Sequence, residues 1–246
     1  MKPLTSGLVF GNWATLLLAT DSRGCLDYTR LTEEIDVLID SKPNGIYSNG
    51  TAGEFYSQSM DEFVKVSEIL SSHCEKAGVA YQIGVSHPCA QESLARLNAI
   101  KHLQPGAVQI ILPDWFPVND EAALSFVTRM AEEAGDIPLV LYNPPHAKKV
   151  LHPEKWQMLK KAAPSLIGVK VFDNNCSQEW YGLMNANKEF QIMITVPGTG
   201  ALNVNETTEE DKGIAFSNDD RKKRKELLGE EKKEVHDLEK DVTDMI

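Results

Sequence analysis

One lysine within a run of apolar residues is the side chain best placed to do covalent chemistry. Lys170 is the only polar residue in residues 166–172, which read Leu-Ile-Gly-Val-Lys-Val-Phe. Burial favours the neutral form of an amine, and a neutral amine can attack a carbonyl carbon to form a Schiff base. The pattern predicts such a nucleophile, with a lysine at a strand end that reaches solvent as the alternative.

A tyrosine and a glycine-rich turn stand at the ends of two earlier apolar runs. Tyr142 begins Tyr-Asn-Pro-Pro and could carry a proton to or from a substrate; a hydrogen-bonded core tyrosine is the alternative. Residues 49–54 read Asn-Gly-Thr-Ala-Gly-Glu, so their backbone N–H groups could cradle a carboxylate or phosphate while Thr51 offers a hydroxyl. A plain tight turn before a helix is the alternative for this loop.

The elements that must position these residues are short, nearly continuous apolar runs, as expected of parallel strands covered on both faces. They occupy residues 13–19, 45–48, 79–85, 107–112, 138–142, 166–172 and 190–196. Between them, apolar residues recur at helical spacing, for example at Val66 and Leu70. This alternation predicts an α/β protein with a parallel sheet, either a (β/α)8 barrel or a doubly wound open sheet. In both architectures active sites gather at the carboxyl ends of strands, where Thr51, Tyr142 and Lys170 stand.

Composition narrows the classes of partner. The chain has 246 residues, 25 basic and 36 acidic, with a net charge of −11, which disfavours nucleic acid as a partner. Its 4 cysteines show no metal-ligand spacing or disulfide framework, so we expect a cytoplasmic protein without a metal site. No apolar stretch approaches the roughly 20 residues that a membrane span needs, so we expect no membrane partner.

Three motifs in this order resemble the dihydrodipicolinate synthase and N-acetylneuraminate lyase family. They are Gly-Thr-Ala-Gly-Glu at residues 50–54, Tyr-Asn-Pro-Pro at 142–145 and Gly-Val-Lys at 168–170. The resemblance covers about residues 7–200 and implies a (β/α)8 TIM barrel that carries out class I aldolase chemistry on a small-molecule 2-keto acid. It also implies a homo-oligomer with no metal and no organic cofactor, the only covalent intermediate being an imine with Lys170.

The resemblance also implies a role for each matching residue. Lys170 corresponds to the Schiff-base lysine, Tyr142 to the proton-shuttling tyrosine, and Thr51 to the hydroxyl that hydrogen-bonds this tyrosine. The substrate carboxylate is expected on backbone N–H groups of the Thr51 loop. The implied substrate-binding residues are Gly50, Ala52 and Gly198.

Some positions depart from the family pattern. Ala52 stands where a second threonine is usual, which removes one side-chain donor to the carboxylate. Ala147 and Trp115 stand where dihydrodipicolinate synthase itself has an arginine and a tyrosine, which argues against that particular activity. Three neighbouring residues are candidate contacts for a second substrate, with solvated loop residues as the alternative: Asp114, His146 and Lys148.

The carboxyl-terminal part of the sequence is the largest departure. We expect the barrel domain to span residues 1–218, with an eighth strand at 213–217, and a charged amphipathic helix to occupy residues 219–246. This helix replaces the longer helical extension of the family. It either closes the barrel or mediates association, or the chain is an altered variant with an incomplete barrel.

The leading functional hypothesis is a Schiff-base-forming lyase that cleaves or forms a carbon–carbon bond in pyruvate or a substituted 2-keto acid. A dehydratase or decarboxylase of a keto-deoxy sugar acid that uses the same imine is the second reading. A barrel that binds a small carboxylate without turnover is the third. The sequence does not name the second substrate or the direction of the reaction.

Overall fold

The apolar runs form the strands of one sheet in the computed structural model, which describes residues 1–144, 146–172, 191–196 and 200–203. Seven strands follow the predicted runs: β1 Asn12–Thr15, β2 Gly45–Ser48, β3 Tyr81–Gly84, β4 Ala107–Ile111, β5 Leu139–Asn143, β6 Leu166–Phe172 and β7 Gln191–Val196. The structure adds β8 Gly200–Asn203, which the sequence analysis did not predict. Strands β1 to β7 pair in chain order, each parallel to the next. The sheet closes on itself through β8, so the protein is an α/β barrel and not an open doubly wound sheet.

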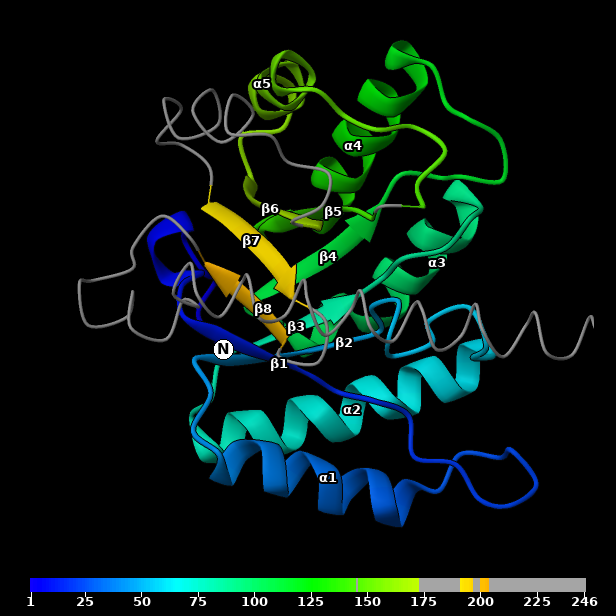
Figure 1. The fold of residues 1–246 in the computed structure, drawn as a ribbon, viewed down its shortest axis with the longest axis vertical. Helices are drawn as coiled ribbons and strands as arrows, with labels where there is room; N and C mark the ends of the chain where they lie inside the picture. The colour runs from blue at the N-terminus through cyan, green and yellow to red at the C-terminus, as the bar shows by residue number, and fades with distance from the viewer. Residues whose placement is uncertain (145, 173–190, 197–199, 204–246) are drawn as a thin grey trace, which may run out of the picture. The chain divides into compact units, whose positions relative to one another are not determined.

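Helices lie between successive strands from β1 to β6 and pack outside the sheet (Figure 1). They are α1 Tyr28–Asp40, α2 Met60–Ala77, α3 Ala90–Ile100, α4 Asp120–Ala134 and α5 Pro153–Ala162, with 3₁₀ turns at Ser6–Leu8 and Lys101–Leu103. Their ends follow from the sequence. The side chain of Ser59 and that of Glu62 form a capping box at the start of α2, and Gly78 ends this helix with a φ of 69°.

The strands divide the core into two parts because successive side chains point to opposite faces. The larger part packs between strands and helices and includes Ile46, Val108 and Ile110. The smaller part fills the barrel interior and includes Tyr47 and Ala107. A residue's place in this alternation therefore decides whether its side chain supports the fold or faces the interior, where the candidate site lies.

The barrel closes differently from the arrangement that the sequence predicted. Strand β8 comes directly after β7 and pairs antiparallel with both β7 and β1, whereas a (β/α)8 barrel has eight parallel strands. The reason is chain length. Only residues 197–199 separate the two strands, and a parallel connection needs a dozen residues or more.

The described residues all belong to one unit, Met1–Glu206. The predicted strand at 213–217, the domain boundary at 218 and the charged helix at 219–246 lie outside the described residues. Within the described part of the chain, no helix combines the length and the apolar character that crossing a bilayer requires.

Candidate active site

Lys170 lies on β6 at a position that faces the barrel interior, since its neighbours Val169 and Val171 belong to the outer core. Its side chain is only 2% exposed, and its Nζ lies 3.9 Å from the ring centroid of Tyr47 and 4.4 Å from that of Tyr142. Burial lowers the pKa of Lys170 to about 7. A strand-end lysine that reaches solvent is therefore the wrong reading.

Tyr142 is the direct register partner of Lys170 on the neighbouring strand β5. Burial raises the pKa of Tyr142, and a hydrogen bond with the Thr51 side chain opposes part of that rise. The phenol is therefore protonated at neutral pH and can donate. The structure thus brings together Thr51, Tyr142 and Lys170, which come from three separate segments of the chain.

Tyr47 belongs to the same cluster, although the sequence analysis did not select it. Its ring packs beneath the Lys170 amine, and its hydroxyl accepts a hydrogen bond from Thr15 Oγ1. Burial raises the pKa of Tyr47 as well. The signal in the sequence is its place one residue after Ile46 in β2, which turns Tyr47 to the opposite face from the outer core.

A buried arginine on α3 donates hydrogen bonds to the backbone of the loop that carries Thr51. Arg96 on α3 is 3% exposed and donates to three backbone carbonyls, those of Phe55 (2.9 Å), Ser86 (3.0 Å) and Gln58 (3.2 Å). Its guanidinium also lies 5.0 Å from the ring centroid of Phe63. Arg96 stands on the apolar stripe of its helix, which is the sequence signal that could have identified it.

We expect Arg96→Met to lower the free energy of unfolding by about 3 kcal/mol, because three carbonyl groups lose a charged donor in a buried place. Urea unfolding followed by circular dichroism measures this change. Arg129→Met is the matched control: Arg129 is exposed, so its loss should change the free energy by less than about 0.5 kcal/mol. Equal stability of the two variants would contradict the supporting role of Arg96.

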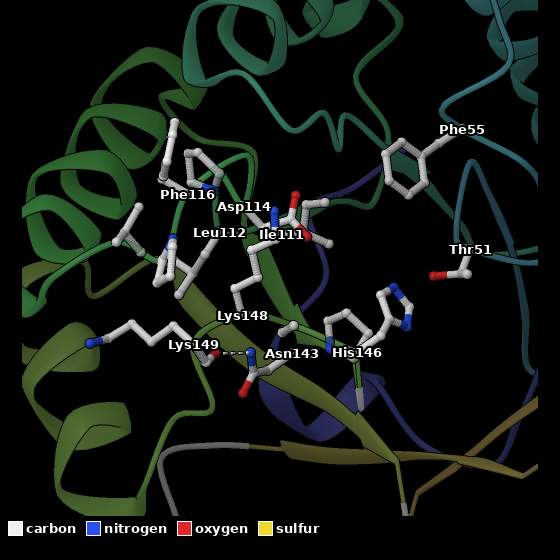
Figure 2. A pocket seen from close by; sticks show the side chains of 15 residues that line it. Thr51, Phe55, Ile111, Leu112, Asp114, Phe116, Asn143, His146, Lys148 and Lys149 are labelled. Carbon is white, nitrogen blue, oxygen red and sulfur yellow. Dashed lines mark hydrogen bonds between the residues drawn. The ribbon is translucent and has the colours of Figure 1, made fainter.

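A pocket opens beside this cluster, at the carboxyl ends of β2, β4 and β5 (Figure 2). Thr51, Phe55 and Ile111 line it, and Phe55 and Ile111 pack against Tyr142 beneath them. The three candidate contacts for a second substrate also line it: Asp114, His146 and Lys148. The pocket therefore joins the loop after β2 to those after β4 and β5. Tyr142 and Lys170 are not among its lining residues; Tyr142 adjoins it through Phe55 and Ile111.

Side-chain hydrogen bonds fix the loop after β5 internally and also join it to the loop after β4. The Asn143 amide donates to the carbonyl of Lys149 (2.9 Å) and accepts from the N–H of Leu151 (2.9 Å). Lys148 Nζ donates to the carbonyl of Trp115 (2.7 Å), which ties this loop to the one after β4. Trp115 itself is 74% exposed, so its indole lies in solvent and not in the cluster around Lys170.

Lys149 lies at the pocket wall, but its amine forms an ion pair with Asp120 at the start of α4 (2.7 Å). Lys155 pairs with the same carboxylate (2.6 Å), and the hydrogen bonds of both lysines lower the pKa of Asp120 to about 2. His146 and Lys148 are the other basic residues that line the pocket, and the Lys148 amine is hydrogen-bonded to the Trp115 carbonyl and not paired with a carboxylate.

The remaining predicted binding residues have different surroundings. Gly50 is buried beside Tyr47, and Ala52 is exposed on the loop. Gly198 lies outside the described residues.

Gly84 in β3 leaves room for the backbone at Asn49, where the loop that carries Thr51 begins. A Cβ atom on residue 84 would lie 2.5 Å from the carbonyl oxygen of Asn49. Among the described residues, no group of three or more His, Cys, Asp or Glu side chains could hold a metal ion.

The fold and the site together define a class: α/β barrels with a buried lysine and a buried tyrosine at the carboxyl ends of neighbouring parallel strands. The chain belongs to the dihydrodipicolinate synthetase family, whose sequence profile matches residues 10–194. The resemblance drawn from the three motifs is thereby confirmed.

Several relatives are similar over most of this chain. The 4-hydroxy-tetrahydrodipicolinate synthase of Methanococcus aeolicus is 30% identical over 193 residues, which cover 74% of this chain and 65% of that protein. The N-acetylneuraminate lyase of Escherichia fergusonii is 24% identical over 193 residues, covering 78% of this chain and 53% of that protein. The chain thus spans less than two-thirds of the length of these curated relatives.

Solved structures agree with this fold. YagE, a prophage protein of the dihydrodipicolinic acid synthase family from Escherichia coli K12 in complex with pyruvate, superimposes with a TM-score of 0.70. It is 21% identical, and the match covers 76% of this chain and 63% of YagE. CdNal from Clostridium difficile, in complex with mannosamine, gives a TM-score of 0.68 at 19% identity, covering 76% of this chain and 63% of CdNal. At such identities the likeness establishes the fold alone.

Proposed function

We propose that this protein is a class I lyase or aldolase, which forms a Schiff base between Lys170 and pyruvate or a substituted 2-keto acid. The observation that carries the proposal is the buried Lys170 amine, whose pKa is lowered to about 7 and which lies against the ring of Tyr142. Family membership and the pyruvate bound in YagE support the choice of substrate.

In the proposed reaction the neutral Lys170 amine attacks the keto carbon, and loss of water gives an iminium ion. In a 2-keto acid with a hydroxyl group on C4, the iminium at C2 accepts the electron pair of the C3–C4 bond when that bond breaks, which leaves an enamine and releases an aldehyde. Tyr142 is protonated beforehand and therefore acts as a relay: its oxygen accepts the proton of the hydroxyl group that becomes the aldehyde as its own phenolic proton moves to the enamine carbon. Its hydrogen bond with Thr51 orients it. Hydrolysis of the resulting iminium then returns the free lysine and the keto acid.

Backbone N–H groups of Thr51 and Ala52 hold the substrate carboxylate in this proposal, beside Gly50. The pocket that adjoins Tyr142 takes the part of the substrate that departs as the aldehyde, and His146 and Lys148 supply positive or hydrogen-bonding groups to it. The covalent imine serves in place of an organic cofactor or a metal. We further propose a cytoplasmic homo-oligomer.

Trapping with borohydride tests this function without knowledge of the second substrate. Sodium borohydride reduces an imine to a stable amine, so incubation with pyruvate should add the mass of one reduced pyruvyl group, and peptide mapping should place it on Lys170. An adduct only on surface lysines would contradict the proposal. A panel of longer 2-keto acids then separates aldol cleavage from dehydration or decarboxylation by its products. A folded protein that traps none of them favours carboxylate binding without turnover.

The pKa of Lys170 predicts the pH dependence of trapping. The amine attacks only when neutral, so the initial rate of adduct formation should rise with pH through about 7 and level off above about 8. An ordinary lysine has a pKa near 10.4, so its rate would still be rising about tenfold per pH unit at pH 9. Quenched time courses between pH 5.5 and 9.5 distinguish the two profiles, with a reductant that remains active over this range.

A further inference from the structure

Two glutamines in the barrel interior have buried amide groups with no hydrogen-bond partner. Gln82 on β3 and Gln109 on β4 are both 0% exposed, and neither the oxygen nor the nitrogen of either amide meets a partner in the part of the chain that the structure describes. A buried amide without partners costs about 1–3 kcal/mol. Side chains that carry this cost in the barrel interior, which also holds the Lys170 amine, are candidates for contact with a ligand.

Gln109 lies on the same interior level as Lys170. In a barrel of tilted parallel strands, side chains from alternate strands meet in one layer. Tyr47 on β2, Gln109 on β4 and Lys170 on β6 lie in such a layer. Gln109 is two residues further along its strand than Ala107, which is in register with Tyr47, and Lys170 is two residues further than Gly168, which is in register with Gln109. The tilt of the strands brings positions staggered in this way to one height in the barrel. The Lys170 amine lies over the Tyr47 ring, which shows that side chains of this layer are in contact.

Gly50 locates the Gln109 amide more closely. A Cβ atom on Gly50 would lie 3.7 Å from Gln109 Nε2 and 3.0 Å from Cε2 of Tyr47. The amide nitrogen is thus next to Gly50, which precedes Thr51 on the loop, on the side of the Tyr47 ring. Thr51 in turn reaches Tyr142 through its hydroxyl.

We propose that Gln109 is a substrate-binding residue, whose Nε2 donates a hydrogen bond to the carboxylate of the 2-keto acid held on the Thr51 loop. This inference rests on the proposed Schiff-base function. Amide N–H groups are strong donors to a carboxylate, and Gln109 supplies one beside a loop on which Ala52 has no side-chain donor. Filling the site satisfies the amide, which explains why a group that destabilises the free protein occupies this position.

Gln109→Met tests the assignment, because methionine keeps the length of the side chain and removes the amide. We expect the pyruvate concentration that gives half-maximal borohydride trapping to rise about 10-fold or more, the usual effect of losing one hydrogen bond to a charged group. At saturating pyruvate the trapped fraction should reach that of the unmodified protein. The melting temperature without pyruvate should stay the same or rise, because an unpartnered polar group has been removed.

Gln82→Met is the matched control. Gln82 is equally buried and equally unpartnered, but its register partner on β4 is Ala107, which lies two residues before Gln109 toward the amino ends of the strands. Its replacement should leave half-saturation within about twofold. Should Gln109→Met not fold, Gln109→Asn keeps the amide but withdraws it by one methylene, and it should also raise half-saturation.

The outcomes are separable. If the unmodified protein gives no pyruvate adduct on Lys170, the proposed function fails and this inference falls with it. If the unmodified protein is trapped and Gln109→Met shows the same half-saturation, Gln109 does not bind the carboxylate. An equal rise in Gln82→Met also overturns the assignment, because the effect would then belong to the barrel interior as a whole.

Discussion

Lys170→Met should abolish pyruvate trapping and all turnover that depends on the imine, while the protein remains folded. Methionine has a similar length and no amine, so no covalent bond to the keto carbon can form. The side chain is 2% exposed and its burial disfavours a charge, so an apolar replacement should keep or raise the melting temperature. Intact mass after borohydride reduction measures the adduct, and thermal unfolding measures the stability.

Lys161→Met provides the control for this variant. Lys161 is an exposed lysine on α5, so its replacement makes the same chemical change at the surface and should leave trapping unaffected. Adduct formation in Lys170→Met at the rate of Lys161→Met would show that another lysine is the nucleophile. The proposed function would then have to be rebuilt around that residue.

Tyr142→Phe should separate imine formation from proton transfer. The ring that lies 4.4 Å from Lys170 Nζ is kept, and only the hydroxyl bonded to Thr51 is lost. Pyruvate trapping should persist. Exchange of the methyl protons of pyruvate with deuterium, which requires proton transfer in the imine and is followed by NMR in D₂O, should slow by about 100-fold or more.

Tyr56→Phe is the matched control for the hydroxyl. Tyr56 lies on the same loop as Thr51, but it is 61% exposed and its ring contacts Phe55. Its deuterium exchange should equal that of the unmodified protein. If Tyr142→Phe exchanges protons as fast as Tyr56→Phe, then Tyr142 does not move the proton, and its role is confined to packing against Lys170.

The sequence by itself determined the parallel strands and the place of the candidate site among them. Continuous apolar runs appear only where both faces of a strand are covered, and motifs directly after such runs must lie at the carboxyl ends of strands. For the same reason Tyr142 and Lys170, on consecutive strands, could be expected side by side. The three motifs also identified the family, because their order and residue types are more specific together than any one of them alone.

Only the tertiary structure decided which interior side chains share a level with Lys170. Alternation along a strand tells which face a residue occupies, but the level depends on register and strand tilt, which involve residues far apart in the sequence. Tyr47 and Gln109 could therefore not be assigned to the site from their own segments. The apolar segment of Lys170 predicted its burial, but not the two tyrosine rings that enclose its amine, because these come from other strands.

Closure of the sheet was likewise decided in three dimensions. The apolar residues of β7 predicted a strand. The strand that pairs with β7 and β1 and completes the barrel is a segment of four residues without a strong apolar pattern, Gly200–Asn203. It pairs with β1 because the first strand of the closed sheet has a free edge that must find hydrogen bonds. Short-range periodicity carries no information about an edge supplied by the opposite end of the fold, and therefore the antiparallel closure appeared only in the structure.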